Sequence, residues 1–222
     1  MAKIHFSVSI NSSDICTNKP VIGNQHPTTK QKHLKAKKIV ITGGPSVGKT
    51  SLIKSLEELD YVCFPEVIRE FTSEESKNKD SETLTSNPIV FADDSMAFNK
   101  LLIEGRSEQY LAAEKMDHNF AFFDRGLPDV LAYMDLFKQT YGDDFIKVCA
   151  SMPYDKVFIL PPWKEIYSND EGRFETYEEG EHLYQHLTNR YVAFGYDPVV
   201  VPTGSITERL DFIFNCLSEL ID

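Results

Sequence analysis

The chain has 222 residues, enough for one α/β domain of ordinary size with a small appendage. Its 34 acidic residues outnumber its 23 basic residues, and the net charge of −11 argues against binding to nucleic acid phosphates. No stretch approaches the ~18 consecutive apolar residues that a transmembrane helix needs. The four cysteines lack metal-ligand spacing, which predicts reduced thiols in a cytoplasmic protein rather than a zinc site or disulfides.

Residues 1–36 differ in composition from the rest of the chain. Residues 1–38 hold seven lysines and one acid, Asp14, and so carry a net charge of +6. Because the whole chain carries −11, the remaining residues carry −17. The segment predicts a disordered extension, with at most one short edge strand at residues 4–10. Two further interpretations stay open. It could be a targeting segment, although it lacks arginine and an apolar stretch, and it fits weak contact with an anionic membrane surface.

From residue 37 onward, short apolar runs alternate with helical periodicity. The pattern predicts five strands, at residues 38–42, 61–64, 119–123, 156–160 and 198–201. It predicts helices at residues 50–59, 66–77, 89–117, 128–141, 177–194 and 206–221. Strands separated by helices indicate a parallel sheet between two helical layers. We therefore expect one α/β domain over residues 37–222, with three layers (α/β/α) and five parallel strands.

A phosphate-binding motif follows the first predicted strand. It fits G-x-x-x-x-G-K-[ST] in full, as Gly43-Gly44-Pro45-Ser46-Val47-Gly48-Lys49-Thr50. Glycines let successive backbone N–H groups turn toward an anion, and the helix that follows adds its positive end. Lys49 would reach the β- and γ-phosphates, and the Thr50 hydroxyl would ligate Mg²⁺. The motif predicts a P-loop NTPase fold that binds a nucleotide, with Ser51 among the contact residues.

An acid and an arginine follow the third predicted strand. Asp124 ends the apolar run of residues 120–123, the usual place of an acid that orients magnesium. It could instead, or in addition, cap the next helix. Arg125 could bind phosphate oxygens in a bidentate manner. The pair favours phosphoryl transfer over a signalling GTPase.

Together with the P-loop, Asp124-Arg125-Gly126 and Pro202-Thr203-Gly204-Ser205 carry a family resemblance. Residues 37–222 resemble the NadR-like P-loop ATPase/kinase family, which contains the ribosylnicotinamide kinase domain of NadR. More distantly, they are similar to deoxynucleoside and thymidylate kinases. The resemblance implies an AAA-type ATP-binding domain of the nucleoside-kinase type, with a short helical lid. None of these motifs specifies a substrate.

The resemblance also implies residues of an acceptor site. Glu66, just after the second strand, occupies the place of the carboxylate that accepts the proton of the substrate hydroxyl. Its alternative role is that of an exposed acid at a helix N-terminus. Arg69, one turn further on, would face the same cleft or pair with a neighbouring acid. Gln109, on the long helix, could bind a base or amide, or could face solvent.

On the donor side, the charged segment 163–177 lies where such kinases carry a lid. Arg173 is the expected lid cation for the transferring phosphoryl group, or a solvated loop arginine. Thr203, Gly204 and Ser205 lie where a loop passes over the nucleotide base, and Ser205 could equally cap the last helix.

Two functions compete at this point. The first is an ATP-dependent kinase that transfers the γ-phosphoryl group to a hydroxyl of a nucleoside-like small molecule. The second is a nucleotide-dependent regulatory or trafficking module with slow hydrolysis. The chain has no N-K-x-D guanine motif, so ATP is the expected nucleotide, with Mg²⁺, and GTP is the less favoured one.

Overall fold

The structure is a computed structural model that describes residues 35–67, 95–167 and 176–220. Within these ranges it contains five strands and six helices. The strands are β1 (Lys37–Gly43), β2 (Val62–Phe64), β3 (Phe120–Asp124), β4 (Lys156–Leu160) and β5 (Val199–Val200). The helices are α1 (Lys49–Glu58), α4 (Ser95–Ala113), α5 (Leu127–Leu136), α6 (Asp143–Ser151), α7 (Tyr177–Ala193) and α8 (Ile206–Ser218).

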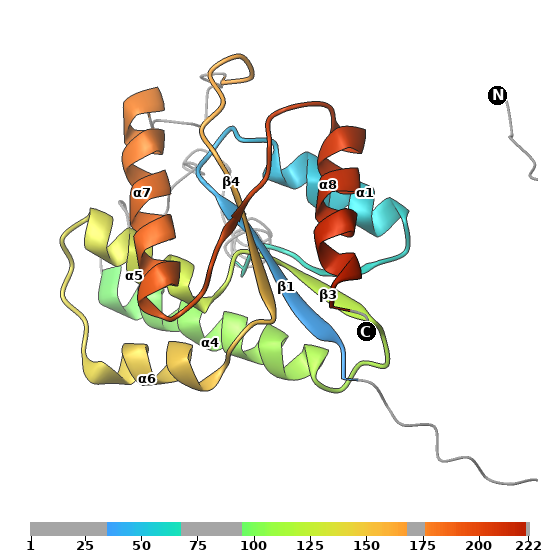
Figure 1. Cartoon of the computed structure of the whole chain (residues 1–222). Helices are drawn as coiled ribbons and strands as arrows, with labels where there is room; N and C mark the ends of the chain where they lie inside the picture. Colours follow the sequence, from blue (N-terminus) through green and yellow to red (C-terminus); the bar gives the residue numbers. More distant parts are fainter. Residues whose placement is uncertain (1–34, 68–94, 168–175, 221–222) are drawn as a thin grey trace, which may run out of the picture. The chain divides into compact units, whose positions relative to one another are not determined.

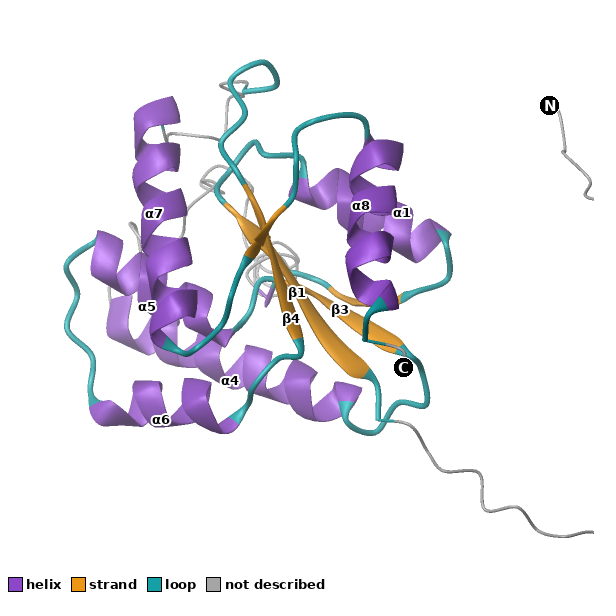
Figure 2. Ribbon diagram, in the orientation of Figure 1, coloured by secondary structure: helices purple, strands orange, loops and turns teal. Residues whose placement is uncertain are grey.

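All five strands form one parallel sheet in the order β2-β3-β1-β4-β5 (Figure 2). The central strand β1 is buried on both faces, which explains its continuous β-branched run. Because all strands are parallel, their carboxyl ends meet at one edge of the sheet, where ligands of such folds bind. The predicted five-stranded parallel sheet is confirmed.

Alternate residues of β1 face two separate hydrophobic cores, as the two-residue period of a strand requires. Val40 packs in the core that α4, α5, α6 and α7 share with β3 and β4. Ile39 and Ile41 pack in the core formed with α1 and α8. Figure 1 shows α1 and α8 on one side of the sheet and α4, α5 and α7 on the other. The predicted three-layer arrangement is confirmed.

Two elements between β3 and β4 differ from the prediction. Helix α5 ends at Leu136 instead of residue 141, because Lys138 takes a left-handed conformation with φ 54° and reverses the chain. Helix α6 was not predicted. It begins after the N-cap Gly142, carries Asp143 and Asp144 in its first turn and buries only two side chains. The helix is only nine residues long, and apolar spacing over so short a run does not separate a helix from a strand.

The other described elements agree with the prediction to within a few residues at their ends. Three predicted parts lie outside the described residues: residues 68–77 of the predicted helix 66–77, the first residues of the predicted helix 89–117, and most of the lysine-rich segment 1–36. None of the described helices combines the length and the apolarity needed to cross a membrane.

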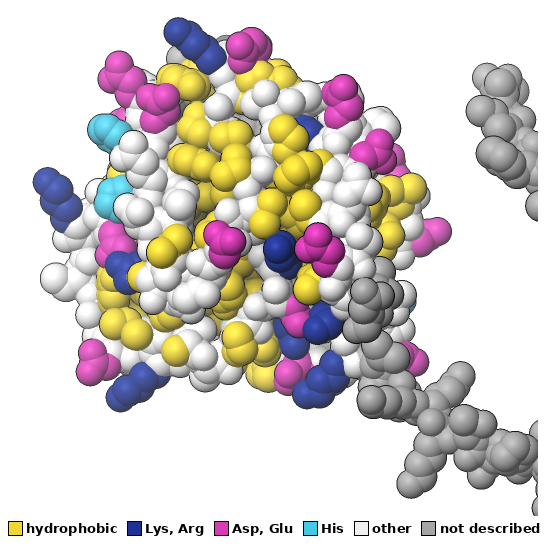
Figure 3. Space-filling view, viewed as in Figure 1, with side chains coloured by type: hydrophobic (Ala, Val, Ile, Leu, Met, Phe, Trp, Pro, Cys, Tyr) yellow, Lys and Arg dark blue, Asp and Glu magenta, His cyan; other side chains and the backbone are white. Residues whose placement is uncertain are grey.

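On the face seen in Figure 3, hydrophobic side chains gather between α7 and α8, and charged side chains lie mostly around them. Val200 on β5 and Ile206 at the start of α8 are 47% and 40% exposed. The edge of the sheet at β5 is therefore less polar than its surroundings.

Candidate active site

The P-loop connects β1 to α1 at the carboxyl edge of the sheet. Three of its residues have positive φ angles: Gly43 at 149°, Ser46 at 57° and Gly48 at 79°. Gly43 also approaches β4 closely, since a Cβ atom there would lie 2.8 Å from the carbonyl oxygen of Leu160. Such a run of turns directs successive N–H groups toward one centre. Backbone geometry therefore explains why residues 43 and 48 are glycine.

Lys49 is the first residue of α1, and only 7% of its surface is exposed. Burial and the nearby guanidinium of Arg125 lower the pKa of the Lys49 ammonium, and the carboxylates of Asp124 and Glu66 oppose this shift. Two cations thus lie close together beside the P-loop. The neighbouring carboxylates offset part of the cost of bringing these like charges together, and two cations beside P-loop N–H groups suit a phosphate site.

The strand order places the acid and arginine of β3 beside the P-loop. Asp124 is the last residue of β3 and lies opposite Ile41 of β1 in the sheet register. Arg125 follows with a φ of 77°, a left-handed conformation that is uncommon for a residue other than glycine. Strained backbone of this kind clusters at functional sites. The conformation lets the Arg125 N–H donate to the carbonyl of Ile41 while the side chain reaches the P-loop.

Arg125 joins the P-loop to the segment after β2. Its Nε lies 2.5 Å from Oε1 of Glu66, and its Nη1 donates to the carbonyl oxygen of Gly43 at 3.2 Å. The side chains of Arg125 and Glu66 are 8% and 12% exposed, so the pair is largely shielded from water. Glu66 is thus held at the site, and the expectation that its side chain would be exposed is wrong.

The ion pair determines the charge state of Glu66. Burial alone would raise the pKa of this carboxyl group. The guanidinium of Arg125, the ammonium of Lys49 and the guanidinium of Arg106 outweigh it and lower the pKa to about 2. Glu66 is therefore ionised at neutral pH and is a weak base as long as Arg125 remains bound to it.

A buried carboxylate that the sequence did not single out supports Arg125. Asp129 is fully buried in the first turn of α5 and accepts hydrogen bonds from Thr42 Oγ1 and Tyr191 Oη. It also accepts one from the backbone N–H of Gly126 at 3.0 Å, and lies 3.5 Å from Arg125 Nη1. Gly126 is therefore the N-cap residue of α5, and the interpretation of Asp124 as that cap is wrong. The sequence signal was an acid at the third position of a helix.

Helix α4 forms the wall next to Glu66. Gly105 allows the close approach, since a Cβ atom there would lie 2.7 Å from Cγ1 of Val67. The half-buried Gln109 donates its amide N–H to the carbonyl oxygen of Pro65 at 2.8 Å, a hydrogen bond that is exposed to solvent. Arg106 is buried and donates to the carbonyl oxygen of Gly126 at 2.7 Å. The structure thus brings Glu66 and Arg125 together and ties Gln109 to the residue that precedes Glu66.

The loop before α8 has a clear structural role. Ser205 is the N-cap of α8: its hydroxyl accepts from the N–H of Glu208, whose side chain bonds back to Ser205. The capping interpretation is therefore confirmed. Contact of Thr203, Gly204 and Ser205 with a nucleotide base stays a prediction. Ser51 is exposed on α1. Arg69 and Arg173 lie outside the described residues.

The residues present fit a magnesium ion that arrives with a nucleotide. Thr50 offers a hydroxyl and Asp124 a carboxylate, the hard oxygen ligands that Mg²⁺ prefers. Among the described residues there is no group of three or more acidic, histidine or cysteine side chains that could hold a metal by itself.

Comparison with known proteins supports this picture. The family model described as an AAA domain matches residues 38–209, well over half of the chain. No curated protein sequence matches the chain significantly.

Solved structures share the fold at low sequence identity. A NadR protein in complex with NAD and AMP-PNP superposes with a TM-score of 0.58 at 19% identity, over 83% of this chain and 49% of the NadR chain. This chain therefore spans about half the length of that protein. A deoxyadenosine kinase from M. mycoides gives a TM-score of 0.54 at 19% identity and covers 82% of this chain and 99% of its own. The thymidylate kinase of Candida albicans gives a TM-score of 0.57 at 16% identity, over 83% of this chain and 92% of the kinase chain. The chain is a member of the AAA-domain family and has the fold of the NadR-like P-loop kinases.

Proposed function

We propose that the chain is an ATP-dependent kinase that transfers the γ-phosphoryl group to a hydroxyl of a nucleoside-like small molecule. The observation that carries this proposal is the ion pair between Glu66 and Arg125 beside the Gly43 carbonyl of the P-loop. It sets a carboxylate suited to an acceptor hydroxyl next to a guanidinium suited to a phosphoryl group.

On the donor side, the P-loop N–H groups and Lys49 would hold the β- and γ-phosphates. A magnesium ion bound with the nucleotide would neutralise charge on the phosphate oxygens, and Thr50 and Asp124 would be its protein ligands. The NadR structure is a complex with AMP-PNP, and a deoxyadenosine kinase structure has dATP bound, which supports a nucleotide at this site. The absence of N-K-x-D in the sequence favours ATP over GTP.

On the acceptor side, Glu66 would orient the hydroxyl group and accept its proton. A carboxylate with a pKa of about 2 accepts protons poorly, so Arg125 would have to leave Glu66 before proton transfer. The phosphoryl group would attract Arg125, and the loss of that cation from Glu66 would raise the pKa of the carboxyl group. Binding of the donor would thereby activate the base only when a phosphoryl group is present.

The acceptor pocket would extend from Glu66 along α4. Arg106 contributes to lowering the pKa of Glu66, so its guanidinium lies within electrostatic reach of that carboxylate. Gln109 fixes the carbonyl of Pro65, the residue directly before Glu66. These contacts would hold the base in place while the acceptor binds.

The test is product formation with a panel of acceptors. The protein is incubated with ATP, Mg²⁺ and a set of nucleosides that includes nicotinamide riboside, and the products are identified by mass spectrometry. Lys49→Ala is the control. A phosphorylated acceptor formed by the wild type and not by Lys49→Ala supports the proposal. Absence of any such product above the Lys49→Ala background across the panel refutes the nucleoside-like acceptor.

A further inference from the structure

An arginine from the last helix lies against the P-loop. Arg209 of α8 is 3% exposed, and its Nη2 donates to the carbonyl oxygen of Val47 at 3.0 Å. Its Nη1 is so close to Gly48 that a Cβ atom on that glycine would lie 2.7 Å away. The contact joins residues 162 positions apart in the sequence. The positive φ of Gly48 favours glycine at this position, and the guanidinium lies directly beside it.

The hydrogen bond to Val47 fixes a peptide plane of the P-loop. In a planar trans peptide, the C=O of one residue and the N–H of the next point in opposite directions. Since the Val47 carbonyl points toward Arg209, the Gly48 N–H points away from it. P-loops bind phosphate through N–H groups of this kind. Arg209 thus fixes the orientation of one phosphate-binding donor of the P-loop, the Gly48 N–H, through its hydrogen bond to the Val47 carbonyl.

Within the described parts of the chain, no carboxylate balances the charge of Arg209. Among the described residues, no acidic side chain lies within ion-pair distance of its guanidinium. Its Nε is buried and makes no hydrogen bond within the described part of the chain. Burial lowers the pKa of Arg209, with no opposing charge. Arg125, by contrast, has Glu66 and Asp129 beside it. A buried guanidinium in this state costs folding free energy unless an anion comes near it.

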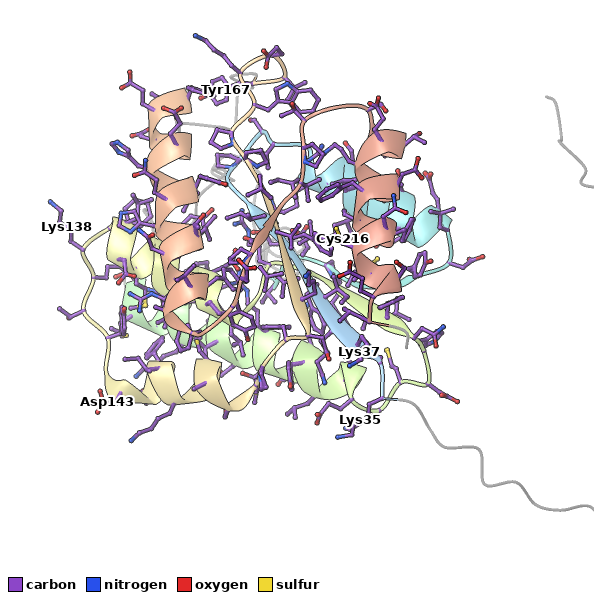
Figure 4. The ribbon with its side chains drawn as sticks, in the orientation of Figure 1. Lys35, Lys37, Lys138, Asp143, Tyr167 and Cys216 are labelled. Carbon is purple, nitrogen blue, oxygen red and sulfur yellow. The ribbon has the colours of Figure 1, made fainter. Side chains whose placement is uncertain are left out.

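Arg209 also lies beside an aromatic ring. The guanidinium carbon lies 5.7 Å from the ring centroid of Trp163, within cation–π range. Trp163 and Tyr167 border a small cavity whose other side is formed by P-loop residues, Pro45 to Val47 among them. Figure 4 shows Tyr167 at the end of the sheet opposite Lys37, the first residue of β1. Trp163 is the chain's single tryptophan, so its fluorescence reports directly on this place.

We propose that Arg209 is a positioning residue of the phosphate cradle, which orients the Gly48 N–H through the Val47 carbonyl and whose charge is balanced by nucleotide phosphates. The inference rests on the nucleotide binding contained in the proposed function, but not on phosphoryl transfer. It implies that Arg209 stabilises the nucleotide complex and contributes little to the stability of the free protein.

The test compares Arg209→Met and Arg209→Lys with Lys54→Met, a control that removes an exposed cation from α1. Affinities for MgATP and for inorganic tripolyphosphate are measured by calorimetry, and unfolding temperatures are measured without ligand. Arg209→Met removes a cation beside the phosphate site and the donor that fixes the Gly48 N–H, so both affinities should weaken about 10- to 100-fold. Its unfolding temperature without ligand should equal or exceed that of the wild type. Arg209→Lys keeps the charge, so its affinities should lie between those of the wild type and of Arg209→Met.

Trp163 fluorescence provides a second readout. Addition of MgATP should change the emission of the wild type and of Lys54→Met, and the change should be much smaller in Arg209→Met at the same ATP concentration. The inference is overturned if Arg209→Met binds both ligands within twofold of the wild type. It is also overturned if Arg209→Met and Arg209→Lys both unfold at lower temperature without ligand, because the role is then structural. Wild-type protein that binds ATP but forms no product would refute the kinase proposal alone.

Discussion

Nε of Arg125 lies 2.5 Å from Oε1 of Glu66, although the two residues are 59 positions apart in the chain. The contact exists because β2 and β3 are neighbours in the sheet and both end at the same edge. It connects the strand end that carries Asp124 with the segment that carries the proposed base.

Arg125→Lys should retain nucleotide binding and lose turnover. A lysine ammonium cannot contact both Glu66 and the Gly43 carbonyl in the way that a planar guanidinium does. Loss of one preorganised donor typically lowers kcat by about 10²–10³-fold, and we expect a decrease in this range with a smaller change in the ATP KM. Steady-state kinetics with the acceptor found in the panel measures both.

The matched control is Arg190→Lys, which alters an arginine that pairs with Asp135 on α5, outside the proposed site. It should leave kcat within about twofold of the wild type. Equal losses of kcat in the two variants would show that the effect of Arg125→Lys comes from general destabilisation and not from the site.

Asp129→Asn should destabilise the domain and disturb the site together. Its carboxylate accepts hydrogen bonds from Thr42, Tyr191 and the Gly126 N–H, and an amide would oppose some of these donors with its own N–H₂ group. Leaving a buried polar group unsatisfied costs about 1–3 kcal/mol, so urea unfolding should show a loss of this size. Asp211→Asn, an exposed position on α8, should change the free energy of unfolding by less than about 0.5 kcal/mol. Similar stability of the two variants would contradict the assigned role of Asp129.

Gly126→Ala and Gly180→Ala should change stability in opposite directions. A Cβ atom at residue 126 would lie 2.6 Å from Tyr191 Oη and 3.0 Å from Tyr154 Cε2, and such overpacking costs about 1–3 kcal/mol. At residue 180, within α7, a Cβ atom would meet nothing within 4 Å. Alanine should therefore stabilise that helix by about 0.5–1 kcal/mol. Thermal unfolding of both variants tests the prediction, and a destabilised Gly180→Ala or a neutral Gly126→Ala would contradict the packing described here.

Glu66→Gln should change the acid sensitivity of the protein. The folded pKa of Glu66, about 2, is below the ordinary value of 4.5, so its ionised form stabilises the fold. This contribution is fully present above about pH 4.5 and is lost as the pH falls from there toward 2, with a slope of at most about 1.4 kcal/mol per pH unit. The free energy of unfolding, measured by urea between pH 6 and 3, should fall less steeply in Glu66→Gln than in the wild type. Glu104→Gln, at an exposed position of α4, should retain the wild-type slope, and equal slopes in all three proteins would contradict the buried ion pair.

Local sequence patterns predicted the parts of this protein that depend on neighbouring residues. The β-branched run of β1, the glycine spacing of the P-loop and the Asp124-Arg125 step are all visible within a few residues, and the structure places them as expected. The five-stranded parallel sheet followed from the alternation of strands and helices.

Contacts between distant segments could not be predicted in this way. The hydroxyl groups that bind Asp129 belong to Thr42 and Tyr191, 87 and 62 residues away. The P-loop contact of Arg209 spans 162 residues, and nothing in the sequence near Arg209 marks it as different from a surface arginine of α8. Which polar side chains become buried depends on the packing of whole helices, so these residues emerge only from the structure.

The most direct test of the proposed activity follows the γ-phosphate of ATP. ATP labelled at that position is supplied with Mg²⁺ and the acceptor panel to the wild type, Lys49→Ala and Glu66→Gln, and labelled acceptor is separated from labelled inorganic phosphate. We predict that the wild type transfers label to a small-molecule acceptor, and that both variants lose at least about 100-fold of this transfer. Label recovered only as inorganic phosphate, at a rate unaffected by any acceptor or by Glu66→Gln, would contradict the assignment of a kinase.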